Sequence, residues 1–196
     1  FEMDGNEIID YKEELPECGT SVVIPATVNG TAVKTIDSNA FKNEIVEIKS
    51  FDKLSFLELF HGPTLAFKDM ALTVLPHLMV ESKKLSGFPK KTLILTATSG
   101  DTGGAALSGF KDVENVFIVV LYPTNGVSPF QAAQMNYYTG KNAIAVSVEG
   151  NFDDCQNLVK KVFTSGIKLN NYELSSANSI NIGRLIPQII YYFYSY

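Results

Sequence analysis

Short apolar runs that alternate with helix-like segments are the feature that most constrains the fold of this chain. Beyond residue 90, four runs are typical of strands, and each leads through a polar turn into a segment with helical spacing. The four runs are KTLILTAT (91–98), NVFIVVLY (115–122), NAIAVSV (142–148) and YELSSAN (172–178). This alternation predicts an α/β fold of βαβ units on a parallel sheet. Ligands of such folds bind where the carboxyl ends of the strands lead into helices.

The sequence before residue 44 has a different character. SVVIPATV and TAVKTI are rich in β-forming residues, and the Asn29-Gly30 pair between them is a hairpin-type turn signal. We therefore predict a small β-rich unit over residues 1–43 and an α/β domain over residues 44–196. The second part begins with two further strands, IVEIKSF and SFLELF, and a helix, DMALTVLPHLMVESKKL, in which Pro76 should introduce a kink at a cost of about 3 kcal/mol. Its last predicted helix is INIGRLIPQIIYYFYSY.

Composition and charge argue against several classes of function. The chain has 196 residues and a formal net charge of −5, so it lacks the basic surface that nucleic-acid binding needs. No apolar run is long enough for a membrane span, and we expect a cytoplasmic protein. Cys18 and Cys155 are far apart and the only histidines are His61 and His77, so we expect neither a disulfide framework nor a metal site. Cys155 falls on the apolar face of the helical segment FDDCQNLVKKVF, which predicts a core residue.

Lys68 stands at the start of a predicted helix, behind a Gly62-Pro63 turn and next to Phe67. An amine that forms a covalent bond with a carbonyl group must first lose its proton, which requires an apolar and restrained environment. Phe67 supplies an apolar neighbour, and Asp69 could cap the helix or pair with a cation. The alternative is an ordinary solvated lysine at a helix start, since surface lysines are common.

A loop of small and polar residues joins the strand KTLILTAT to the next helix. The loop consists of Ser99, Gly100, Asp101, Thr102, Gly103 and Gly104. Its glycines let the backbone approach a ligand closely, and the free N–H groups at the helix start suit a carboxylate or a phosphate. Its polar side chains can cap the helix and hydrogen-bond a bound group. An ordinary capped turn between a strand and a helix needs the same residue types, so the spacing alone leaves both interpretations open.

Five sequence blocks resemble those of the threonine synthase family, in the family's order and over roughly residues 44–196. The blocks are LELFHGPTLAFKDMAL, TATSGDTGGAAL, YPTNGVSPFQAAQM, VEGNFDDCQNLVKKVF and SSANSINIGRLIPQIIYYF. The resemblance implies a fold-type II pyridoxal-phosphate enzyme with a tryptophan synthase β-like fold. The implied reaction converts O-phosphohomoserine and water to threonine and phosphate, with pyridoxal phosphate as the electron sink. The resemblance implies a small-molecule substrate without a nucleic-acid or membrane partner, and it leaves the oligomeric state open.

The same resemblance assigns roles to particular residues. Lys68, in HGPTLAFKD, matches the lysine that bonds covalently to the cofactor and then moves protons at the α- and β-carbons of the substrate. The implied cofactor ligands are Lys68, Ser99, Gly100, Asp101, Thr102 and Gly103. The implied substrate ligands are Ser99, Thr102, Asn178, Ser179, Asn181 and Arg184. By its own chemistry, Arg184 could bind an anion or simply pair with an acidic side chain.

Parts of the sequence depart from the family pattern. TSVVIPATVNGTAVKTIDSNAFKN resembles one unit of a BspA-type leucine-rich repeat, and we find no counterpart of the family's glycine-rich loop for the cofactor phosphate. We therefore expect a truncated or fused segment with little or no turnover, and poor solubility from the aromatic helix over 185–196. Two alternatives stay open. One is a non-catalytic α/β module that binds a small anion, and the other is a repeat-type recognition protein.

Overall fold

The computed structural model describes residues 46–87 and 89–196, together with five short strands that lie between residues 2 and 36. The chain divides into two compact units, residues 1–58 and residues 59–196. The predicted boundary after residue 43 and most of the predicted leucine-rich repeat lie outside the described residues, so both stay predictions. Within the described part of the chain, no helix has both the length and the apolar content that a membrane span requires.

The first unit consists of short paired strands. β3 (Thr27–Val28) and β4 (Thr31–Ala32) pair antiparallel, as the predicted hairpin requires. β1 (Glu2–Asp4) pairs antiparallel with β2 (Glu7–Asp10), and β2 pairs parallel with β5 (Thr35–Ile36). These pairings agree with the β-rich character of this part of the sequence.

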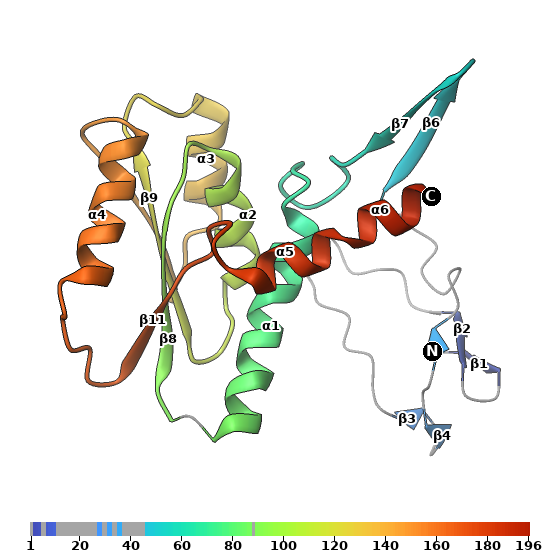
Figure 1. The fold of residues 1–196 in the computed structure, drawn as a ribbon, viewed down its shortest axis with the longest axis horizontal. Helices are drawn as coiled ribbons and strands as arrows, with labels where there is room; N and C mark the ends of the chain where they lie inside the picture. Colours follow the sequence, from blue (N-terminus) through green and yellow to red (C-terminus); the bar gives the residue numbers. More distant parts are fainter. Residues whose placement is uncertain are drawn as a thin grey trace. The chain divides into compact units, whose positions relative to one another are not determined.

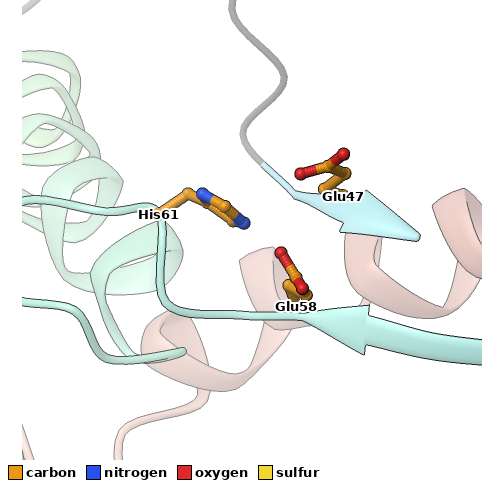
Figure 2. A group of neighbouring side chains, drawn as sticks. All are labelled: Glu47, Glu58 and His61. Atoms are coloured by element: carbon orange, nitrogen blue, oxygen red, sulfur yellow. The ribbon is translucent and has the colours of Figure 1, made fainter. Parts of the chain in front are cut away.

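A hairpin of β6 (Glu47–Phe51) and β7 (Leu54–Glu58) completes the first unit. It confirms the two strands predicted there, but they pair antiparallel with each other and stay outside the parallel sheet of the second unit. Glu47 and Glu58 lie at facing positions of the two strands (Figure 2), and Lys49 pairs with Glu47. The hairpin thus brings two carboxylates together at its open end, an arrangement that weakens a strand pair by charge repulsion.

Four strands among the described residues of the second unit form one parallel sheet, which confirms the predicted α/β fold. Its strands are β8 (Lys91–Ala97), β9 (Val116–Pro123), β10 (Ala143–Val148) and β11 (Tyr172–Ser175). Their order in space is β10-β9-β8-β11, so the chain builds outward on one side of β8 and then returns to its other side. Open parallel sheets bind ligands at such a reversal, outside the carboxyl ends of the strands.

Helices cover both faces of this sheet (Figure 1). α4 (Phe152–Thr164) packs against β8 and β9 on one face. α2 (Asp101–Phe110) packs against β9 and β10 on the other, where it also contacts α1 (Asp69–Ser86) and α3 (Pro129–Tyr137). Because α2 follows β8 directly, its first residues lie at the carboxyl end of the sheet.

The core of the second unit lies on the α2 side of the sheet. Its largest fully buried side chains are Leu72, Ile94, Leu107, Phe110, Ile118 and Met135. α1 and α2 approach each other most closely at Gly109, where a β-carbon would overlap the Leu72 carbonyl oxygen. Cys155 is fully buried on α4, which confirms the predicted core residue, and burial raises the pKa of its thiol.

The last predicted helix is wrong in one respect, because it is two helices. α5 (Ile182–Gln188) packs against α1 and ends at Ile189, and α6 (Ile190–Ser195) follows at once. Pro187 has no N–H to donate to the fourth residue before it, and Ile189 donates to the Ile186 carbonyl oxygen in a tighter turn. The buried Pro76, by contrast, lies inside α1 without ending that helix.

Candidate functional site

The turn between β8 and α2 is organised by Thr98, a fully buried residue. Its Oγ1 accepts hydrogen bonds from Gly100 N at 3.0 Å and Gly103 N at 2.9 Å, and donates to Gly100 O at 3.1 Å. Gly100 is the N-cap residue of α2 and has a φ of +145°, which glycine adopts readily and other residues rarely do. The prediction that Ser99, Asp101 or Thr102 caps the helix is therefore wrong. Thr98, just before the loop, already accepts the hydrogen bonds of the Gly100 and Gly103 N–H groups.

Lys68 lies at the N-cap position of α1 and is largely withdrawn from water. Its side chain is 14% exposed, and Nζ lies 3.4 Å from Asp101 Oδ2 and 4.1 Å from the centroid of the Phe67 ring. Asp101 itself is 53% exposed, so this ion pair sits at the edge of the site and solvent screens it. The solvated-lysine alternative does not describe this residue. Two positions 33 residues apart in sequence, Lys68 and Asp101, meet here, although β7, the strand before Lys68, lies outside the parallel sheet.

Asp69 holds the loop that carries Lys68. Its carboxylate accepts hydrogen bonds from Thr64 N at 2.9 Å, from Ala66 N at 3.3 Å and from the Thr64 hydroxyl. Asp69 is buried, and the packing is close enough that a β-carbon on Gly62 would overlap its side chain. Asp69 lies one residue after the N-cap position of α1, and its carboxylate binds the preceding loop instead of capping the helix, one of the two roles that the sequence had left open. It folds the preceding loop back onto the start of the helix.

Three side chains from distant parts of the chain fasten the same loop. Gln134 of α3 donates to Thr64 O at 3.2 Å, and Tyr138, just after α3, donates to Pro63 O at 3.0 Å. From α6, the hydroxyl of Tyr191 donates to Phe67 O at 2.6 Å, directly before Lys68. The sequence analysis missed all three, since partners 70 to 124 positions apart leave no local pattern. They make the position of Lys68 a property of the whole unit.

The buried phenol of Tyr191 makes the stability of this site depend on pH in the alkaline range. Burial and, secondarily, the negative charge of Asp69 raise the pKa of its phenol above the usual 10.0. Because the folded state favours the neutral phenol, its contribution to stability is complete below pH 10 and is lost as the pH rises through the raised value.

We expect Tyr191→Phe to flatten this alkaline loss. Urea unfolding of the unmodified chain should show a steeper fall in the free energy of unfolding above pH 10 than the Tyr191→Phe variant does. Tyr192→Phe is the matched control, because Tyr192 is 76% exposed on the same helix. Equal alkaline slopes for Tyr191→Phe and Tyr192→Phe would contradict the prediction.

The fifth motif block, which begins SSANSINIGR, follows on from the end of β11 and lies next to the turn after β8. Asn178 donates to Ala97 O at 2.9 Å, which ties this segment to the carboxyl end of β8. Asn181 accepts from Gly183 N at 2.9 Å and thereby caps α5. Ser179 is exposed. Thus Asn178 and Asn181 have structural hydrogen bonds, which accounts for them without a ligand.

The hydrogen bonds of Arg184 do not fully account for its buried position. It is 6% exposed, and its Nη1 donates to Ala177 O at 2.9 Å. Its Nε has no hydrogen-bond partner among the described residues. Burial lowers the pKa of the guanidinium from its ordinary value, although a guanidinium keeps its charge under all ordinary conditions. A buried cation with a spare donor is costly unless an anion or a water molecule meets it.

Comparison with known proteins shows which enzymes this chain resembles. The chain is 46% identical over 139 residues to threonine synthase of Pseudomonas aeruginosa, a match that covers 71% of this chain and 29% of that protein. It is 40% identical over 195 residues to human threonine synthase-like 1, covering 93% of this chain and 26% of that protein. The crystal structure of PLP-bound threonine synthase from Brucella melitensis matches 77% of this chain and 32% of that chain, with 44% identity and a TM-score of 0.68. This chain contains a threonine synthase-like segment.

The threonine synthase-like segment has the fold-type II architecture that the sequence predicted. The chain spans less than a third of the length of the Pseudomonas and human relatives. The human match extends into residues 1–43 and gives no support to a leucine-rich repeat there. No protein-family model matches the chain.

Proposed function

We propose that the threonine synthase-like segment provides the reactive lysine and part of the substrate site of a pyridoxal-phosphate-dependent lyase. The proposed reaction converts O-phosphohomoserine and water to threonine and phosphate, and a cytoplasmic location is part of the same proposal. The observation that carries it is the environment of Lys68, whose amine is largely buried, faces Asp101 and lies at the carboxyl end of the parallel sheet. The type of reaction in this proposal is taken from the threonine synthases to which the chain is similar.

The described residues fit the aldehyde and carboxylate side of such a site. A pyridoxal aldehyde needs an amine held away from bulk water, and Lys68 is the candidate, with a side chain 14% exposed. A carboxylate needs aligned N–H donors, and since Thr98 takes up the N–H of Gly103, the proposal assigns this task to the N–H groups of Asp101 and Thr102 in the first turn of α2. The hydroxyls of Ser99 and Thr102 lie in this turn as further donors. Pyridoxal phosphate, when bound, would supply an electron sink for negative charge at the substrate carbons.

The residues of this chain would then have distinct tasks. Lys68 Nζ would take and return protons at the α- and β-carbons of the substrate, because its amine faces Asp101, the first residue of α2. The N-terminus of α2 would hold the substrate carboxylate. Arg184, with its spare buried Nε, would bind the phosphate of the substrate by charge-assisted hydrogen bonds. Asn178 would keep the Arg184 segment against β8, and Asn181 would close the turn before α5.

The proposal is tested by trapping the lysine that reacts. We would mix the purified chain with pyridoxal phosphate, reduce with borohydride, digest, and locate the pyridoxyl group by mass spectrometry. We expect the label on Lys68 above every other lysine, because its amine is largely buried and held in place at the site, whereas surface amines are hydrated and mobile.

Two variants sharpen this experiment. Lys68→Arg keeps a positive charge beside Asp101 but cannot be labelled, so the specific label should disappear while the fold persists. Lys111→Arg removes a lysine from just after α2, next to the ring of Tyr137, and should leave the label on Lys68 unchanged. Labelling spread evenly over the surface lysines would overturn the proposal and favour a non-catalytic anion-binding module.

A further inference from the structure

Gln131, in the first turn of α3, has both ends of its side chain engaged. Its Oε1 accepts a hydrogen bond from Ser128 N at 3.0 Å, and its backbone N donates to Ser128 Oγ at 3.1 Å, which together make a capping box. Its Nε2 donates to Asp101 Oδ1 at 2.8 Å. A residue that caps one helix therefore also holds the carboxylate at the start of another.

The two oxygens of Asp101 are divided between two partners. Oδ1 accepts from Gln131, and Oδ2 faces Lys68 Nζ at 3.4 Å. The Gln131 amide also packs against Gly100 so closely that a β-carbon there would overlap it. Thus Gln131 orients the carboxylate of Asp101 so that one oxygen faces Lys68. Gly100, at the N-cap of α2, leaves room for the Gln131 amide.

The capping role alone does not explain a glutamine at this position. A capping box works with glutamate as well as with glutamine, since only an acceptor oxygen is needed. Glutamate, however, could not donate to Asp101 and would place a second negative charge beside it. The capping box uses only Oε1 of the amide. The remaining NH₂ group, Nε2, donates a hydrogen bond to Asp101.

We propose that Gln131 is a positioning residue for Lys68. Through Asp101 it holds one carboxylate oxygen toward the amine and keeps the local negative charge to a single carboxylate. The catalytic meaning of this arrangement rests on the proposed function, but the effect on the amine does not. Three other ionisable groups around the loop, those of Asp69, Tyr138 and Tyr191, make hydrogen bonds to the loop itself.

The test is the pH profile of Lys68 reactivity in the chain without added cofactor. Lysines would be acetylated with limiting acetic anhydride across a pH series, and the extent at Lys68 would be read by mass spectrometry. In Gln131→Glu, a second carboxylate beside Asp101 favours the protonated form of the amine, so we expect the midpoint to move up by about half a pH unit. Gln156→Glu adds the same charge on α4 and should leave the profile unchanged.

A second variant covers the case in which Gln131→Glu does not fold. Gln131→Met removes the donor without adding charge, so Asp101 is no longer held toward Lys68 and the midpoint should move down, opposite to the shift in Gln131→Glu. Profiles of Gln131→Glu and Gln131→Met that coincide with that of the unmodified chain overturn the proposal. Failure of the proposed function would look different, because pyridoxal labelling would then be unspecific while the acetylation midpoint still shifted.

Discussion

Replacing Asp69 with alanine is expected to lower the free energy of unfolding by about 3 kcal/mol. The carboxylate accepts hydrogen bonds from the backbone N–H groups of Thr64 and Ala66 and from the Thr64 hydroxyl. Without it, donors at a buried site lose their partner, at about 1–3 kcal/mol for each unsatisfied group. The loop before Lys68 would also lose its closure onto α1, so the specific pyridoxyl label on Lys68 should decline. Urea denaturation followed by circular dichroism measures the first effect.

Two further substitutions separate the hydrogen bonds from the mere presence of an acid. Asp69→Asn keeps the size of the side chain and one acceptor oxygen, so its loss of stability should lie between those of the unmodified chain and Asp69→Ala. Asp153→Ala removes an exposed acid from the first turn of α4 and should change stability by no more than about 0.5 kcal/mol. A urea midpoint of Asp69→Ala equal to that of Asp153→Ala would show that the buried carboxylate does not hold the loop.

Replacing Gly109 with alanine should separate α1 from α2. A β-carbon there would overlap the Leu72 carbonyl oxygen and lie 2.7 Å from the Leu72 carbonyl carbon, and backbone atoms cannot turn aside as a side chain can. Overpacking of this kind costs about 1–3 kcal/mol or more, and the better helix propensity of alanine returns about 1 kcal/mol. We expect a net loss of about 2 kcal/mol in the free energy of unfolding, measured by urea denaturation.

The same substitution should act on the site. α1 begins directly after Lys68 and α2 begins at Asp101, so helices forced apart carry the two charged groups apart. The preference of the pyridoxyl label for Lys68 should therefore weaken. Gly140→Ala is the matched control, because its β-carbon would meet only the flexible Lys111 side chain, at 3.5 Å. If Gly109→Ala unfolds at the same urea concentration as Gly140→Ala, the two helices are not packed as described.

The second unit was predictable because its information is local. The apolar runs that became β8, β9, β10 and β11 fall between helical segments, and that alternation fixes parallel strands joined by helices. The same rule placed Asp101 at the carboxyl end of the sheet, but not Lys68, because the strand before Lys68 lies in a separate antiparallel hairpin. The break between α5 and α6 also had a local signal, Pro187, which the sequence analysis overlooked.

The support of the site could be predicted only in part. The Ser128-to-Gln131 spacing is a capping box that the sequence displays, although the analysis did not use it. Nothing in the sequence indicated that Gln131 would reach Asp101, or that Thr98 would take over the cap of α2. These contacts depend on how closely α2 and α3 pack, and the sequence of neither helix determines that distance.

The sequence by itself determined the strands, most of the helices, the parallel order that brings two loops to one edge, and the family to which the motif blocks are similar. Each of these depends on residues close in sequence, or on blocks that can be compared one by one. Tertiary structure alone decided that Lys68 is withdrawn from water and that its loop is fastened by Gln134, Tyr138 and Tyr191. The physical reason is that burial and long-range hydrogen bonds come from elements that meet only in the folded chain, so no stretch of sequence contains both partners.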